Sequence, residues 1–468
     1  MVQLDGSGLS ASAVAAIAER RETASLATGV HARVAASAEF GMRAATERPV
    51  YGRTTGVGAN RSVTLADPEA QAQGLLRSHA TSAGPERSRE RVRAMLAVRL
   101  NQLAAGGSGV SVAVVDALAA MLAEDALPAV RELSGVGTAD LAPLASTALA
   151  LAGLTVTTPP LQAVTPVGIG DALGFMSSNA ATLGDAALAL AGLRPLARAA
   201  LSVAALSHTA VDGNAEAYAA AVELATPFPG ARAVCAAMRD RLAGAGPAAR
   251  IQDPFGLRAL PQVHGALLDR LDELDTVFTS MANAPSENPL LIPGEPVAHH
   301  GAFHAAYLAQ ALDATRSALA QAAELGLSRI TMFAEPALTG QPPFLADGTP
   351  GACGAMVLEY TAAAALGQLR AAATPVAIQA ITLSRGLEED GSFASLGAAS
   401  ALSTIAPYRT VVACELVVAL RCLRLRGTPW PAALADVLEL CAALPADVHD
   451  RDLTGDIAAA EELLPALA

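Results

Sequence analysis

The second half of the chain consists of long segments rich in alanine and leucine, whose apolar side chains would cover nearly every face of a helix. These segments span residues 172–198, 262–282, 304–325, 354–373, 393–425 and 431–443. Alanine is the strongest helix former, and a helix that is apolar all round must be buried on most sides. The sequence therefore predicts a mainly α protein with a long central helix bundle. Burying so many apolar helices favours a homo-oligomer.

The first part of the chain has a different character. Helical patterns there alternate with glycine-rich loops at 47–59 and 132–143. We expect two regions: a mixed, loop-rich N-terminal region over 1–200, and the long-helix bundle with C-terminal helices over 201–468. Hydrophobic residues make up 52% of the 468 residues and charged residues 16%, which is ample for a large core and excludes a disordered chain.

The charged residues exclude several kinds of chemistry. All 31 basic residues are arginines, so the chain has no lysine for a Schiff base, a pyridoxal phosphate anchor or a P-loop. The formal net charge is -13, which makes nucleic acid and anionic membranes poor partners. We expect a small-molecule substrate instead.

The cysteines and the N-terminus bear on location. Five cysteines are scattered without a CxxC pair, which is typical of buried free thiols in a reducing compartment. The first residues lack a basic start followed by an apolar run, and the apolar stretches 141–156 and 186–206 are too short or too interrupted for a membrane span. These features predict a cytoplasmic protein without membrane segments.

Two local patterns give further expectations. The arginines at 87, 89, 91, 93 and 99 are expected on a solvated helix face. Asp140 is placed to cap the helix that follows it.

Polar residues in and beside the small-residue loops are the candidates for chemistry. Tyr51 stands at the mouth of a loop with three glycines, His79 ends a helical segment, and Arg258 follows a Gln-Asp-Pro turn. A tyrosine, a histidine and an arginine supply a base, an acid and a carboxylate clamp, although spacing alone does not bring them together. His299 and His300 are adjacent rather than one helical turn apart, so we predict no metal site.

Five motifs resemble the histidine and phenylalanine ammonia-lyase family, in the family's order and across roughly residues 10 to 430. The family's Y-G-x-x-T-G-x-G loop is matched by YGRTTGVG at 51–58, and its R-S-H helix end by RSH at 77–79. Its Q-D-P-Y-S-L-R-x-x-P-Q-V segment is matched by QDPFGLRALPQV at 252–263. Its S-x-N-P-L and Y-T-A-A-A motifs are matched at 286–290 and 360–364.

The resemblance implies the family's fold, a homotetramer whose pockets are each built from three chains, and roles for individual residues. Tyr51 would be the base, His79 would orient or protonate the substrate, and Arg258 would clamp a substrate carboxylate. The other implied pocket residues are Gln252, Phe255, Phe303, Gln368 and Asn179. Because an ordinary tyrosine has a pKa of about 10, the base role requires a lower pKa, for which helix N-termini and nearby Arg77 are candidates.

Several implied pocket positions depart from the family pattern. Phe255 replaces a tyrosine, Ala302 replaces the asparagine of G-N-F-H, and Gln368 replaces a glutamate. Direct spacing puts Ser177 at the position of a pocket asparagine, with Asn179 two residues on.

The largest departure concerns the family's prosthetic group. Members form a methylidene-imidazolone, MIO, from Ala-Ser-Gly in A-S-G-D-L-A-P-L. This chain has Gly137, Thr138 and Ala139 before the retained D-L-A-P-L. A glycine at the third position lets the backbone reach the geometry for cyclisation, whereas Ala139 carries a Cβ. We predict an ordinary uncyclised peptide here and no cofactor.

These features predict a lyase that acts at the α and β carbons of an amino-acid-like substrate, by elimination or its reverse, without MIO. Two alternatives stay open. One is an aminomutase or a conjugate-addition or cyclisation enzyme of secondary metabolism. The other is a catalytically inactive ligand-binding or scaffold homologue.

Overall fold

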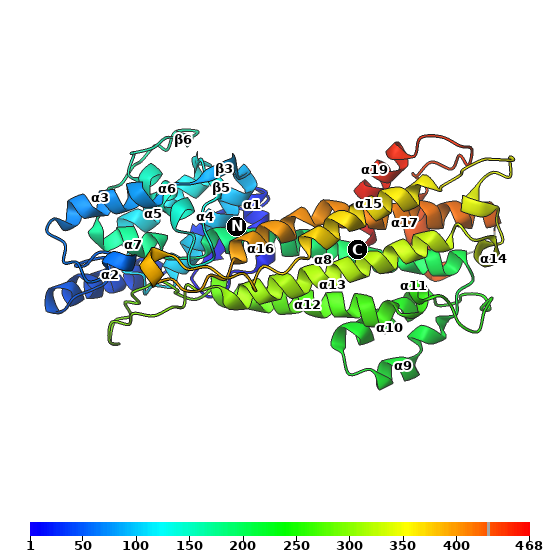
Figure 1. Ribbon diagram of the computed structural model, residues 1–468, viewed down its shortest axis with the longest axis horizontal. Coiled ribbons are helices and arrows are strands. Elements are labelled where there is room, and N and C mark those ends of the chain that lie inside the picture. Colours follow the sequence, from blue (N-terminus) through cyan, green and yellow to red (C-terminus); the bar gives the residue numbers. More distant parts are fainter. Residues whose placement is uncertain (428–430) are drawn as a thin grey trace. The chain divides into compact units, whose positions relative to one another are not determined.

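Helices make up most of the computed structural model, which describes residues 1–427 and 431–468 (Figure 1). The expected mainly α class is confirmed. The described residues form two compact units. Unit 1 comprises Met1–Ala191, Leu274–Asp313 and Pro375–Leu402, and unit 2 comprises Gly192–Glu273, Ala314–Thr374 and Ser403–Ala468. The expected division at residue 200 stays a prediction, because each unit is assembled from segments that are distant in the sequence.

Unit 1 packs short helices around one another and carries all the described strands. Helix α1 packs on α4, α3 on α6 and α7, and α4 on α5. Its helices are α1 (Ala11–Ala18), α2 (Val30–Glu47), α3 (Pro68–His79), α4 (Arg89–Ala104), α5 (Val112–Ala123), α6 (Leu141–Leu151), α7 (Ile169–Met176) and α16 (Ala394–Ser403), with 3-10 turns η1 (Gly58–Asn60) and η4 (Ser384–Gly386). Ser10 caps α1, because its Oγ accepts from the Ala13 N–H at 3.2 Å.

Three two-stranded sheets join the loops of unit 1. β1 (Val2–Leu4) pairs with β2 (Ala24–Leu26) in parallel. β3 (Ala83–Glu86) pairs antiparallel with β5 (Arg131–Leu133), and β4 (Leu127–Pro128) pairs antiparallel with β6 (Thr157–Thr158). The pairs β3–β5 and β4–β6 flank the segment that leads to the 137–139 loop.

Unit 2 is built almost entirely of helices. Helix α17 packs against α15 and α19, and α10 packs against α9. Its helices are α9 (Ala220–Ala225), α10 (Pro229–Arg241), α11 (Phe255–Arg258), α14 (Pro336–Thr339), α15 (Val357–Ala372), α17 (Ile405–Arg426), α18 (Ala435–Cys441) and α19 (Thr454–Leu463), with short 3-10 turns η2 (Ala215–Tyr218), η3 (Pro343–Leu345), η5 (Ala432–Leu434) and η6 (Leu464–Leu467). Three long helices, α8 (Ala180–Ala210), α12 (Leu260–Ala282) and α13 (Ala306–Met332), contribute residues to both units.

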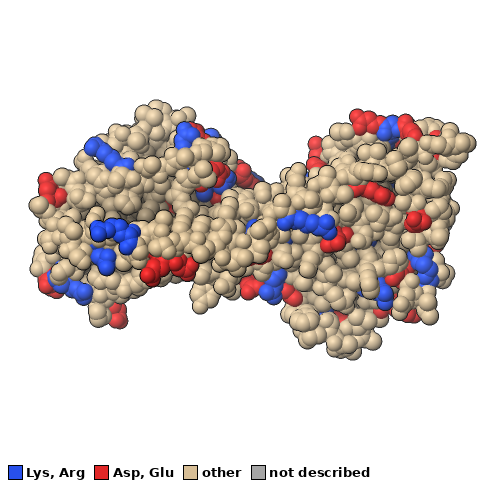
Figure 2. Space-filling view, viewed as in Figure 1, with Lys and Arg blue, Asp and Glu red and all other residues tan. Residues whose placement is uncertain are grey.

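Most of the expected arginine face is not solvated. Arg99 is fully buried and donates to Glu287 at 2.6 Å, while Arg87 and Arg91 donate to Asp185 at 2.8 Å. The expectation was wrong because the spacing of arginines in the sequence does not reveal which carboxylates the fold brings opposite them. On the face in Figure 2, basic and acidic side chains are interspersed without a broad basic patch.

Asp140 precedes α6 but its carboxylate does not cap it. The two oxygens instead accept from the Thr182 N–H at 2.8 Å and the Thr182 hydroxyl at 2.9 Å. The carboxyl group is fully buried, and this burial raises its pKa above the usual range despite those bonds. Asp140 therefore fixes the end of the 137–139 loop to α8.

Two stretches, Ile169–Ala210 and Ala394–Arg426, are long and apolar enough to cross a membrane by length and composition. The fold buries 72% and 67% of their most apolar windows. This burial is typical of core helices in a water-soluble protein.

Candidate functional site

A cavity of about 1070 Å³ lies within unit 1, where loops from four parts of the chain meet. We call these the Tyr51 loop (49–62), the 137–139 loop, the His loop (299–304) and the acidic loop (384–390). Pockets for small ligands usually measure about 300–1,000 Å³. The expected site residues that line this cavity are Tyr51, His79, Thr138, Ala139 and Phe303.

The Tyr51 loop folds back on itself so that the phenol oxygen lies over its own backbone. The Gly58 N–H donates to Tyr51 Oη at 2.7 Å. Gly52 and Gly58 have φ of 70° and 54°, a region that glycine adopts without a steric penalty. The glycines of this motif therefore allow the turn that presents the hydroxyl to the cavity.

The electrostatics of Tyr51 differ from the expectation. Burial is the largest influence and raises the pKa of the phenol above 10, and Glu388 raises it further. The Gly58 hydrogen bond and Arg61 lower the pKa, but by less than burial raises it, and Arg77 is not among the influences. In the single chain the Tyr51 hydroxyl is therefore protonated near neutral pH.

His79 ends helix α3, which Asp67 caps by accepting from the Ala70 N–H at 3.0 Å. The His79 Nδ1 lies 2.9 Å from the Leu75 carbonyl oxygen. Because a carbonyl only accepts, Nδ1 carries a proton there. Nε2 is the ring nitrogen left without this bond, on a residue that lines the cavity.

The 137–139 loop is held against the start of α16. The Ser392 hydroxyl donates to the Gly137 carbonyl at 2.7 Å, and the Phe393 N–H donates to the Val136 carbonyl at 2.9 Å. Gly137 has φ of 85°, and a Cβ there would lie 2.2 Å from Ser392 Oγ. This close approach requires glycine at the first position of the loop.

The other two loop residues face the cavity. The Thr138 hydroxyl lies 3.4 Å from Glu388 Oε2. Ala139 has φ of 95°, a left-handed conformation that is costly for a residue with a Cβ. The loop therefore keeps alanine where its backbone shape suits glycine.

The His loop contributes two imidazoles that the sequence analysis set aside. His299 Nε2 accepts from the Tyr51 N–H at 3.2 Å, and the two rings meet edge to face with centroids 6.4 Å apart. Burial, Arg48 and His300 lower the pKa of His299, which favours the neutral acceptor. His300 Nδ1 accepts from the Ala302 N–H at 3.0 Å, so its Nε2 donates to the Glu287 carbonyl at 2.7 Å.

Asn179 does not line the cavity but contacts the backbone of the His loop. Its Nδ2 donates to the Phe303 carbonyl at 2.5 Å, and its Oδ1 is buried without a partner among the described residues. Ser177 lines the cavity itself, and its hydroxyl accepts from the Asn288 N–H at 3.1 Å. Ser177 therefore lines the cavity, whereas Asn179 does not.

The acidic loop was not expected from the sequence. Glu388, Glu389 and Asp390 line the cavity with Tyr51, and the Ala59 N–H donates to Ser384 Oγ at 3.1 Å, which joins the acidic loop to the Tyr51 loop. Asp390 also lies 3.5 Å from His304 Nε2. Three consecutive acidic residues between glycines were the available signal.

Four expected site residues belong to unit 2, and none of them lines the described cavity of unit 1. Gln252, Phe255 and Gln368 are exposed. The Arg258 guanidinium lies over the Phe255 ring, 4.6 Å from its centroid, and its Nε is buried without a hydrogen-bond partner in the described chain. A buried guanidinium nitrogen without a partner is suited to an anion supplied from outside.

The turn that carries Arg258 is firmly built. Arg329 donates to the Gly256 carbonyl at 3.0 Å and to both oxygens of buried Glu415, at 2.6 and 2.7 Å. The Tyr218 hydroxyl donates to the Leu257 carbonyl at 2.8 Å.

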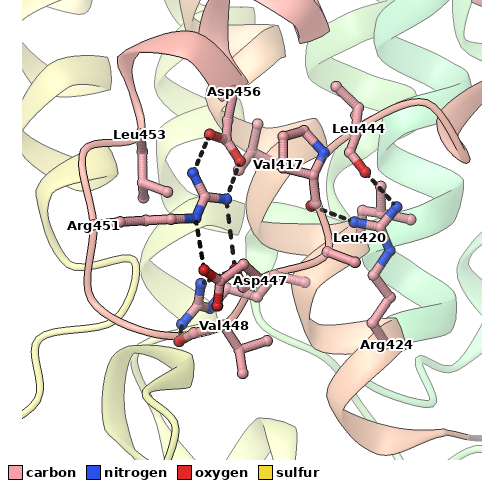
Figure 3. A pocket seen from close by; sticks show the side chains of 12 residues that line it. Val417, Leu420, Arg424, Leu444, Asp447, Val448, Arg451, Leu453 and Asp456 are labelled. Carbon is pink, nitrogen blue, oxygen red and sulfur yellow. Dashed lines mark hydrogen bonds and ion pairs between the residues drawn. The ribbon is translucent and has the colours of Figure 1, made fainter.

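A smaller pocket, which lies in unit 2, is not a candidate site. Its volume is about 20 Å³, and its arginines already form hydrogen bonds and ion pairs with neighbouring residues (Figure 3). Arg451 forms two bonds of 2.6 Å to Asp456, and Arg424 donates to the Pro445 and Leu444 carbonyls at 2.6 and 3.0 Å. Within 1–427 and 431–468, no group of three His, Cys, Asp or Glu side chains is placed to hold a metal ion.

Comparisons with known proteins agree with this geometry. The aromatic amino acid lyase family model matches residues 9–443. Histidine ammonia-lyase from Streptomyces coelicolor is 33% identical over 98% of this chain and 96% of its own length.

Solved structures give the same result. Tyrosine aminomutase from Streptomyces globisporus superposes with a TM-score of 0.92 at 26% identity, covering 100% of this chain and 97% of its own. Histidine ammonia-lyase from Trypanosoma cruzi superposes with a TM-score of 0.90 at 25% identity, covering 99% and 93%. The chain therefore belongs to the aromatic amino acid lyase family and is an enzyme of the carbon–nitrogen lyase type.

Proposed function

We propose that the chain eliminates or adds a group across the α and β carbons of an amino-acid-like substrate, without MIO. One observation carries this proposal: the Tyr51 hydroxyl, the His79 imidazole and the 137–139 loop line a single cavity in one compact unit. The general base would remove the β proton, and an oriented acid would assist departure of the α substituent.

Tyr51 is the proposed base, and its protonation state sets a requirement. Lowering its pKa from above 10 to about 7 would take at least roughly 4 kcal/mol. The Gly58 N–H and Arg61 act in that direction, against burial and Glu388. The positively charged amino group of a bound substrate would lower the pKa further, so the base would become active only with substrate present.

The residue at the third position supports an uncyclised 137–139 loop. Ring closure would require attack of the Ala139 nitrogen on the Gly137 carbonyl carbon. Ala139 adds a Cβ at the position that the family reserves for glycine, with φ of 95°. These residues do not fit the prosthetic group well. The substrate then needs a better leaving group than ammonia, such as a quaternary ammonium, or an already acidic proton.

Intact mass spectrometry of the purified chain tests this part of the proposal. We expect the mass that the sequence gives, with no near-ultraviolet band beyond that of the aromatic side chains. A mass lower by two waters, one from ring closure and one from Thr138, would show that MIO forms. The double variant Thr138→Ser/Ala139→Gly is the matched comparison, since it restores two of the family's three residues.

Arg258 is the proposed carboxylate clamp, supplied by a neighbouring chain of a homotetramer. Its Nε lacks a partner in the described chain, and Phe255 beside it is 67% exposed. Arg258→Met should raise the apparent KM more than it lowers kcat. The reason is that it removes an ion pair with the substrate carboxylate that would form in both the ground state and the transition state. A monomer in sedimentation analysis at micromolar concentration would contradict the shared site.

The activity itself is tested by assaying the chain with amino acids, their quaternary ammonium derivatives and conjugated acids. Formation or consumption of an α,β-unsaturated acid, absent in Tyr51→Phe, would support the lyase. A product with the amino group moved to the β carbon would favour the aminomutase alternative, which the structural similarity to tyrosine aminomutase supports. Inactivity of the wild type on all of them would favour the binding or scaffold alternative.

A cytoplasmic location, without nucleic acid or membrane partners, is part of the proposal.

A further inference from the structure

Arg53 is a buried cation in the Tyr51 loop that the proposed chemistry does not use. The residue is 8% exposed, and its Nη2 donates to the Gly109 carbonyl at 2.7 Å and to the Gly170 carbonyl at 2.6 Å. Gly109 precedes α5, and Gly170 lies in the first turn of α7. One guanidinium therefore ties the Tyr51 loop to two other elements of unit 1.

The walls of this guanidinium site are glycines. A Cβ at Gly109 would lie 2.4 Å from Arg53 Nη2, one at Gly41 would lie 3.1 Å from Cζ, and one at Gly170 would lie 3.2 Å from Nη1. Three segments distant in sequence thus approach one planar group closely. Burial is the larger influence and lowers the pKa of Arg53 from its ordinary value, while the nearby Asp171, whose carboxylate accepts from the Ser111 N–H at 2.7 Å, acts in the opposite direction.

Arg53 is only two residues from Tyr51, within a short turn. The Arg53 N–H donates to the Val50 carbonyl at 3.1 Å, and Gly52 between them packs against Leu173 of α7. We propose that Arg53 is a positioning residue, whose guanidinium in this glycine-lined site holds the Tyr51 hydroxyl against the Gly58 N–H.

This inference rests on the proposed role of Tyr51 as the base, but its test does not depend on activity. The reporter is hydrogen exchange of the Gly58 amide, which is bonded to Tyr51 Oη at 2.7 Å. Tyr51→Phe removes only the acceptor and gives the exchange rate without that bond. Arg53→Ala should approach this rate, roughly three- to tenfold faster than the wild type.

Chemical rescue separates positioning from general loss of stability. Arg53→Ala leaves a space shaped for guanidinium, so millimolar guanidinium chloride should return Gly58 exchange to within about twofold of the wild type. Sodium chloride and methylammonium chloride at the same concentration should not, because neither supplies a planar set of donors. Arg53→Lys should also fail to restore full protection.

Arg33→Ala is the matched control. Arg33 of α2 also donates to two backbone carbonyls, those of Ala104 at 2.9 Å and Asp5 at 2.8 Å, but it lies outside the Tyr51 loop. Its loss should leave Gly58 exchange unchanged. If Arg53→Ala does not fold, Gly109→Ala, whose Cβ would displace the guanidinium, should show the faster exchange.

The proposal is overturned if Gly58 exchange in Arg53→Ala equals that of the wild type. It is also overturned if the faster exchange responds equally to sodium and guanidinium chlorides, or if Arg33→Ala produces the same change. An inactive wild type with successful rescue would reject the lyase and leave the positioning role of Arg53 intact.

Discussion

Two loops line the same cavity of unit 1, and they differ in whether glycine occupies the positions where the backbone φ is positive. In the Tyr51 loop, glycine occupies the positive-φ positions 52 and 58. In the 137–139 loop, Gly137 has φ of 85°, but Ala139 carries a Cβ at φ of 95°. The first loop retains the residues that its conformation requires. The second loop also lines the cavity, but it has alanine at position 139, where the backbone conformation suits glycine.

This difference bears on two separate parts of the proposed function. The Tyr51 loop would supply the group that handles a proton, together with the backbone that presents it. The 137–139 loop differs from the family's Ala-Ser-Gly at each position that would form the prosthetic group. Because different loops supply the two parts, the proposal requires only that the acid–base site is kept while the neighbouring electrophile is lost.

The largest expected effect comes from removing the Tyr51 hydroxyl. Tyr51→Phe keeps the ring packing and deletes the acid–base group, so turnover on the true substrate should fall about 10²- to 10⁴-fold, or at least roughly 3 kcal/mol in barrier. Steady-state kinetics of the two proteins measure this loss. Unchanged turnover would show that the Tyr51 loop does not carry the chemistry.

The second test adds a Cβ to the better-suited loop. Gly52→Ala would place a Cβ 2.1 Å from Leu173 Cδ2 at a φ of 70°. We expect a loss of about 1–3 kcal/mol in the free energy of unfolding, measured by denaturant titration. A change within about 0.5 kcal/mol would mean that the Tyr51 loop tolerates a Cβ as the other loop does.

The third test removes a Cβ from the other loop. Ala139→Gly relieves the left-handed strain but loses a small buried methyl group, so we expect a gain of about 0.5–1 kcal/mol in the free energy of unfolding. Denaturant titration beside Gly52→Ala makes the comparison direct. Destabilisation would show that Ala139 is not strained and would remove the contrast between the loops.

The smallest effect is a pH dependence. Burial raises the pKa of Tyr51 above 10 in the folded chain, so the unfolded chain releases this proton at lower pH. The stability that this shift contributes is complete below pH about 10 and decreases as pH rises through the higher folded value. The measurement is the difference in phenolate absorbance between the wild type and Tyr51→Phe, which should titrate above pH 10. A titration below pH 10 would indicate that Tyr51 is already activated as a base without substrate.

The sequence singled out several of the residues that line the cavity of unit 1. The motif at 51–58, with its glycines and Tyr51, predicted a loop at the site, and the D-L-A-P-L motif predicted the loop before α6. The acidic loop was not predicted, because a short run of carboxylates is ordinary on a protein surface. Arg99 and Arg87 were placed on a solvated face for a related reason: their partners, Glu287 and Asp185, lie about 190 and 100 residues away.

The sequence by itself determined the helical class, the family and the identity of the groups that can act, because helix propensity and motif residues are local properties. The tertiary structure alone decided which of those groups share one cavity, that Arg53 is held by Gly109 and Gly170, and that Gly137 must lack a Cβ beside Ser392. Those outcomes depend on contacts between residues far apart in the chain, whose partners no local pattern specifies.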